Sequence, residues 1–167
     1  MRLSPAARLC DAGADMGHHC CAHKMEDLLA RLEAACRAGG QRVTAPRRRV
    51  LEAVARAAEP VGAYAVLEVL PDLHPPTVYR ALEFLEGAGL LHRVASRSAY
   101  MVCGAARAHA GTQFLICDVC GHVEVAPAPA LPAALVAQAE GAGFAPTRWA
   151  TELHGTCAAC RGGKTDA

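Results

Sequence analysis

The sequence lacks three features that would place it in common functional classes. It has no apolar run of about 18 residues, the length that a membrane-spanning helix needs, so we expect no membrane span. Residues 1–14 contain basic residues and alanines but no sustained apolar stretch, which argues against a secretory signal peptide. The formal net charge of only +1 excludes a globally basic nucleic-acid binder. We therefore expect a cytoplasmic protein in which any DNA contact depends on local basic patches.

Cysteine, in contrast, is abundant, with 9 residues in a chain of 167. So many cysteines are unusual in a cytoplasmic protein unless they bind metal. Four of them form two C-x-x-C pairs, Cys117 with Cys120 and Cys157 with Cys160. Four thiolates at this spacing can complete a tetrahedral shell around one Zn²⁺, so the pairs predict a structural zinc site.

The alternatives to zinc are a disulfide or a redox dithiol. A disulfide is disfavoured because no secretory signal is present. A redox dithiol would need a thioredoxin-like turn from strand to helix, whereas the sequence after Gly121 continues as a strand. A pure zinc-ribbon interaction module would leave the stretch from Thr77 to Ala81 unexplained.

Helical periodicity and capping signals organise the first half of the chain. Thr44 is a suitable N-cap with Pro46 in the first turn. His74-Pro75-Pro76 should be extended, because a residue before proline avoids the helical region. A turn is expected at 59–62, and Arg97-Ser98 should lie at the tip of a hairpin. We predict helices at 25–38, from 44 onward, at 63–70 and at 77–87, and strands at 90–94 and 99–102.

The second half should form a small α/β unit closed by the zinc site. The patterns predict strands at 114–117, 123–125 and 144–153, and a helix at 133–141. The fold class is therefore α+β, and helices followed by a β-hairpin give the order of a winged helix-turn-helix domain. The expected organisation is a disordered tail at 1–24, a winged-helix domain at 25–103, a hinge at 104–113, a zinc-binding domain at 114–161 and a disordered tail at 162–167. In the first tail, we interpret the His18–His23 cluster as adventitious metal affinity rather than a built site.

A specific series of motifs resembles the ferric uptake regulator family, and its zinc uptake regulator branch most. The residues that carry the resemblance are Pro75–Leu82 followed by Gly89-Leu90, supported by 42–44, 47–51, 114–121 and 152–157, and the match covers roughly residues 25–161. The resemblance implies a homodimeric, zinc-dependent repressor of zinc-uptake genes on a pseudo-palindromic double-stranded DNA operator, with a C-terminal dimerisation domain. It implies neither an enzyme nor a small-molecule substrate.

The helix that begins at Thr77 is the candidate reader of DNA. Its first turn presents Thr77, Tyr79 and Arg80; a helix N-terminus favours phosphate, and arginine can bind guanine through two hydrogen bonds. Tyr79 could instead pack in the core, but the resemblance favours DNA contact. Tyr64, at the start of the preceding helix, is a candidate for a contact with the DNA backbone.

A run of basic residues precedes these helices, with four arginines in eight residues and no acid: Arg42, Arg47, Arg48 and Arg49. Such a run is often only a solvated face. Beside a helix-turn-helix, we favour contact with phosphates, which position a protein without reading sequence.

The resemblance further implies a regulatory zinc held by His92, Cys103 and His109, giving two zinc ions per monomer with the four-cysteine site. One thiolate with imidazoles suits zinc better than iron, so Cys103 argues against the alternative of an iron-, manganese- or peroxide-sensing regulator.

The fourth ligand of this site is open. The family's glutamate would fall at Val125, and Glu124 lies one residue early, which places it on the other face of a strand. Glu124, His122 or a water molecule could complete the site. A further family site uses a histidine where Trp149 stands here, so we predict that this site is missing.

Overall fold

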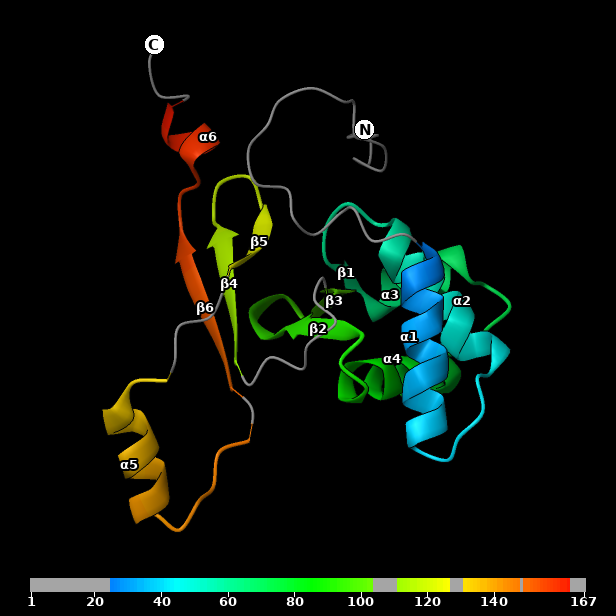
Figure 1. Cartoon of the computed structure of the whole chain (residues 1–167). Coiled ribbons are helices and arrows are strands. Elements are labelled where there is room, and N and C mark those ends of the chain that lie inside the picture. Colours follow the sequence, from blue (N-terminus) through cyan, green and yellow to red (C-terminus); the bar gives the residue numbers. More distant parts are fainter. Residues whose placement is uncertain (1–24, 104–110, 127–130, 148, 163–167) are drawn as a thin grey trace. The chain divides into compact units, whose positions relative to one another are not determined.

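The computed structural model describes residues 25–103, 111–126, 131–147 and 149–162 (Figure 1). The chain separates into two compact units. The first combines the residues up to His92 with Ala99–Gly104, and the second combines Arg93–Ser98 with the chain from Ala105 onward. The His18–His23 cluster and the expected tails, apart from Gly162, lie outside the described residues. Within the described part, no helix is long and apolar enough to cross a membrane.

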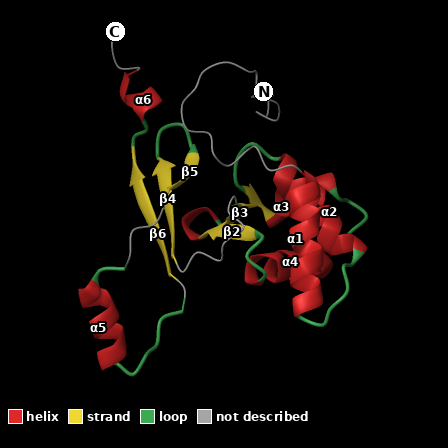
Figure 2. Cartoon of the chain, in the orientation of Figure 1, coloured by secondary structure: helices red, strands yellow, loops and turns green. Residues whose placement is uncertain are grey.

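The first unit contains four helices and a small sheet whose strand order is β1-β3-β2 (Figure 2). The β2–β3 connection is a short 3₁₀ turn, Ala95–Arg97, closed by Ser98 at a positive φ of 47°. The elements are α1 (Met25–Ala38), α2 (Ala45–Arg56), β1 (Val61–Gly62), α3 (Ala63–Val69), α4 (Pro75–Gly87), β2 (Leu91–Val94) and β3 (Ala99–Val102).

The core of this unit forms from the apolar stripes that the helical periodicity predicted. Helix α1 buries Leu28, Leu32 and Cys36. Helix α2 buries Val50, Leu51 and Val54, and α4 buries Val78, Ala81, Leu82 and Leu85. Because each stripe faces the same cluster, the helices pack together and the predicted winged helix-turn-helix arrangement is confirmed.

Two local expectations for this unit were wrong. The helix expected from Thr77 begins at Pro75, because proline is tolerated in the first turn, where no intrahelical N–H bond is needed. His74 is extended, as expected, and is the N-cap. The turn expected at 59–62 includes strand β1, which pairs Val61 with Tyr100 and was hidden by its length of 2 residues.

The second unit is built on a three-stranded sheet of order β5-β4-β6. Strand β4 pairs antiparallel with β5 and parallel with β6. The side chains of Phe114 and Ile116 are buried on one face, whereas Leu115 points to the other, more exposed face. The elements are β4 (Gly111–Cys117), β5 (Val123–Ala126), α5 (Ala133–Gly141), β6 (Trp149–Gly155) and α6 (Ala158–Gly162).

The strand boundaries here differ from the sequence-based expectation. Strand β4 begins three residues earlier than expected, at Gly111, where the paired Trp149 indole occupies the space that a Cβ would need. Strand β6 begins at Trp149 rather than at Phe144, and α6 was not expected. Trp149 therefore covers a glycine on the neighbouring strand.

Candidate metal centre and nucleic-acid interface

The two C-x-x-C pairs meet because β4 and β6 run parallel in register. The register ends with Cys117 beside Gly155, which is two residues before Cys157. Cys117 is the last residue of β4 and Cys120 lies in the turn after it, while Cys157 follows β6 and Cys160 lies in α6. One sheet pairing thus joins two turns that are far apart in the sequence.

The geometry of the four cysteines fits a tetrahedral zinc ion. Their sulfur atoms all lie within 4.8 Å of one another, and the Sγ atoms of Cys120 and Cys157 are 3.8 Å apart. Sulfurs that are each about 2.3 Å from one zinc ion in a tetrahedron lie about 3.8 Å from one another. None of the four forms a disulfide. The predicted set of four cysteines is therefore brought together as a site that could hold zinc.

Hydrogen bonds hold the two turns in this geometry. The N–H of Asp118 donates to the Gly155 carbonyl at 2.8 Å, and the N–H of Gly121 donates to the Cys117 carbonyl at 3.0 Å. Gly121 has a φ of 82°, which suits a residue without a Cβ. The guanidinium of Arg97, within the same unit, donates to the carbonyls of Gly121 at 2.9 Å and Cys117 at 3.3 Å.

The thiols differ in how easily they ionise. The pKa of Cys117 is lowered to about 6, because the backbone N–H groups of Cys120 and then Cys157 stabilise its thiolate. The pKa of Cys160 is raised to about 12, because it shares hydrogen bonds with the side chains of Cys157 and Cys120. Because zinc is bound by thiolates, a zinc ion at this site would displace the protons of the four cysteines.

Two residues expected at the regulatory site, His92 and Cys103, belong to the first unit. Cys103 follows β3 with only 3% of its surface exposed, and its N–H donates to the Leu90 carbonyl at 2.9 Å. This bond places Cys103 opposite Leu90, so His92, two residues further along, shares its face of the hairpin. His109 lies outside the described residues.

The candidates for the fourth ligand lie in the second unit. Glu124 is exposed on β5 and pairs with Leu115, so its side chain points to the exposed face of the sheet. Val125 pairs with the buried Phe114 on the opposite face. As the sequence predicted, Glu124 and Val125 therefore point to opposite faces of the sheet. The described pairing of β4 with β5 contains no bulge there. His122 lies in the turn between the strands and its carbonyl accepts the N–H of Cys117 at 2.9 Å.

The candidate DNA-reading residues lie on the face of α4 away from the core. Arg80 is exposed and Tyr79 is 40% exposed, while Thr77 is half-buried. The exposure of Tyr79 does not favour the alternative that it packs in the core. Tyr64 on α3 is 76% exposed. The side chains of Tyr64, Tyr79 and Arg80 are thus accessible to a ligand.

Within the described residues, the first turn of α4 offers no free backbone N–H to a phosphate. Pro75 and Pro76 have no N–H, and the N–H groups of Thr77 and Val78 both donate to the His74 carbonyl. DNA recognition by this helix would therefore depend on side chains rather than on the helix terminus.

The basic run is mostly engaged in contacts within the protein. Arg48 pairs with Glu52 at 2.9 Å, and Arg49 forms two hydrogen bonds with the carboxylate of Asp72. Arg47 donates to the Arg42 carbonyl at 3.1 Å. Arg42 itself is exposed, so it is the arginine of this run best placed to meet a phosphate.

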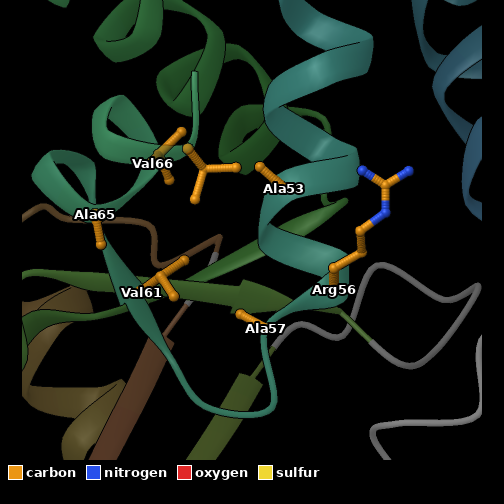
Figure 3. A pocket seen from close by; sticks show the side chains of 7 residues that line it. Ala53, Arg56, Ala57, Val61, Ala65 and Val66 are labelled. Carbon is orange, nitrogen blue, oxygen red and sulfur yellow. The ribbon is translucent and has the colours of Figure 1, made fainter. Parts of the chain in front are cut away.

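Residues of α2, α3 and strand β1 also line an open pocket of about 220 Å³ (Figure 3). Short apolar side chains such as Ala53 and Val66 line it, and the side chain of Arg56 points away from them. None of the residues expected to bind metal or DNA lines this pocket.

Sequence reasoning missed two arginines that contact the candidate sites. Arg31 of α1 donates to the Cys103 carbonyl at 2.8 Å, and Arg97 reaches the first cysteine turn. Neither arginine belongs to a motif or a charge run, so local sequence carried no signal for its partner.

The chain is similar to known proteins over most of its length. Residues 38–154 match the model of the Ferric uptake regulator family. The zinc uptake regulation protein of Escherichia coli (strain K12) is 36% identical over 141 residues, which cover 81% of this chain and 82% of that protein. The structure of holo XcZur is 36% identical with a TM-score of 0.71, and covers 83% of this chain and 99% of that one. A zinc uptake regulator complexed with zinc and DNA is 34% identical with a TM-score of 0.74, and covers 84% and 97%. With this match over most of its length, the chain belongs to the ferric uptake regulator family.

Proposed function

We propose that the protein is a zinc-dependent, DNA-binding transcriptional repressor of zinc-uptake genes, which acts in the cytoplasm as a homodimer on a pseudo-palindromic operator. Family membership and the identity to zinc uptake regulators support this function. The observation that carries the choice of metal is Cys103, a buried thiol on the same hairpin face as His92. A thiolate with imidazole nitrogen suits zinc better than iron.

Two zinc ions per monomer would have different roles. The four-cysteine site would be structural, because a zinc ion bound there contributes directly to the folding free energy of the second unit. His92, Cys103 and His109 would form the regulatory site. Glu124, His122 or a water molecule would supply its fourth ligand.

The recognition surface would combine base-reading and phosphate-contacting side chains. Thr77, Tyr79 and Arg80 would face the major groove, with Arg80 the candidate for guanine. Tyr64, Arg42 and Arg48 would contact the DNA backbone. Arg47 would support this surface indirectly, because it holds the carbonyl of Arg42.

A homodimer would form through the second unit. Leu115 and Leu153 are register partners in β4 and β6 and are 37% and 52% exposed on the same face. Apolar side chains gathered on one exposed face of a sheet support its use as an interface.

Zinc and DNA binding would be linked through this dimer. His92 and Cys103 belong to the hairpin that follows the recognition helix, so occupancy of their site would favour one arrangement of the two winged helices. Because such coupling is reciprocal, operator DNA should tighten binding of the regulatory zinc.

A comparison of two cysteine variants tests this function. We expect wild type to contain two zinc ions per monomer and to bind an operator, selected from random duplexes by the zinc-loaded protein, only when buffered free zinc is sufficient. Cys103→Ala should retain one zinc and lose zinc-dependent binding. Cys36→Ala is the matched control, because Cys36 is equally buried but lies in the α1 core.

The result against the proposal is a Cys103→Ala protein that keeps both zinc ions and normal zinc-dependent DNA binding. A wild-type protein that binds the operator with iron or manganese at physiological levels, and not with zinc, would favour another metal as the signal.

A further inference from the structure

Arg31 of α1 connects this helix to both ends of the β2–β3 hairpin. One guanidinium nitrogen donates to the Cys103 carbonyl at 2.8 Å, and the other donates to the Gly89 carbonyl at 3.0 Å. Gly89 precedes the first strand of the hairpin, and Cys103 follows the second. A single planar side chain therefore joins the two ends of the chain segment that carries His92 and Cys103.

The bond from Arg31 replaces a missing bond of the hairpin. In a hydrogen-bonded antiparallel pair, the two residues normally exchange two N–H···O bonds. Here the N–H of Cys103 donates to Leu90, but the N–H of Leu90 donates instead to the Leu85 carbonyl of α4 at 2.9 Å. The Cys103 carbonyl accepts from Arg31, so the backbone of Cys103 is held on both sides.

We propose that Arg31 is a positioning residue for Cys103 in the regulatory zinc site. This inference rests on the proposed function, because it concerns the same site. A zinc–thiolate bond tolerates deviations of only about 0.2 Å in its length. Cys103 lies just beyond the end of β3, so an anchor on its carbonyl restricts its backbone, and hence the position of its sulfur.

Arg31 is not needed to attach α1 to the core. Leu28, Leu32 and Cys36 of the same helix are each at most 1% exposed and supply that packing. A role in stability alone would therefore change the melting temperature and leave zinc affinity untouched. A positioning role predicts weaker zinc binding at one site only.

The test uses the full-length protein with the four-cysteine site filled. Affinity for the second zinc ion is measured by competition with a chelator of known zinc affinity. Arg31→Gln should weaken this binding about tenfold to a hundredfold, as expected when a group that orients a metal ligand is removed. Arg31→Lys should recover part of the loss, because a single ammonium group cannot reproduce the two-pronged donor. Arg37→Gln, at an exposed arginine of the same helix, should leave the affinity unchanged.

Cobalt in place of the second zinc gives a further readout. The thiolate-to-cobalt charge-transfer absorption should weaken or shift in Arg31→Gln and stay as in wild type in Arg37→Gln. An Arg31→Gln protein with wild-type affinity and cobalt spectrum overturns the inference, even if its melting temperature falls. If this variant cannot be purified, Arg31→Met takes its place, because it also removes both donors, and wild-type affinity there has the same meaning. A wild-type protein that binds only one zinc ion overturns the regulatory site itself, and this inference with it.

Discussion

The guanidinium carbon of Arg47 lies 3.5 Å from the centroid of the Phe84 ring. The same side chain donates to the side-chain oxygen of Gln41 at 2.6 Å and to the Arg42 carbonyl at 3.1 Å. Arg47 therefore ties the loop between α1 and α2 to α4. This arrangement gives a predicted phosphate contact a second role within the fold.

Replacing Arg47 should lower stability more than replacing its neighbour. Arg47→Ala removes a cation–π contact that contributes about 0.5–2 kcal/mol, so we expect a loss of that size in the free energy of unfolding. Arg48→Ala should cost less than about 0.5 kcal/mol, because its pair with Glu52 is an exposed pair within one helix. Urea unfolding followed by circular dichroism measures both, and equal losses would contradict the structural role of Arg47.

Arg80→Ala should weaken operator binding without affecting zinc content or melting temperature. Loss of a two-bond contact to guanine costs about 1–3 kcal/mol and relaxes specificity at one base position. Binding to a series of single-base operator variants tests this. A uniform loss over all sequences, with a smaller salt dependence, would show instead that Arg80 contacts phosphate.

Cys157→Ser should remove the structural zinc and unfold the second unit. The three remaining cysteines hold zinc poorly, because a structural site needs four ligands to close its tetrahedral shell. Wild type stripped of zinc by a strong chelator should show the same loss of cooperative unfolding. A variant with full zinc content and the wild-type melting temperature would refute the four-thiolate site.

Leu153→Glu should weaken the homodimer, because it places a charge within the exposed apolar face of β4 and β6. The matched control is Leu135→Glu on α5, where the leucine is also 52% exposed but is not in the sheet. Sedimentation over a range of protein concentrations should give a weaker dimer for Leu153→Glu only. Equal behaviour of the two variants would place the interface elsewhere.

Sequence patterns were most informative where structure is local. The boundaries of α1 and α5 agree with the prediction, because helical periodicity with a following glycine pair marks α1 and an alanine-rich run after Pro132 marks α5. The C-x-x-C spacing likewise identified the four cysteines, since each pair needs only one turn of chain. Strand β1 and helix α6 were missed because they have only 2 and 5 residues.

The sequence by itself therefore determined which cysteines could bind zinc, which faces of the helices are apolar and which side of α4 faces solvent. Only the tertiary structure decided the partners. The parallel register of β4 and β6 joins the two cysteine pairs. The packing of α1 brings Arg31 to the Cys103 carbonyl. Helix α4 places the Phe84 ring against the guanidinium of Arg47. Long, flexible arginine side chains can serve solvent, DNA or a carbonyl equally well. Their role is fixed by which acceptor the fold places within reach, and no local pattern in the sequence encodes that distance.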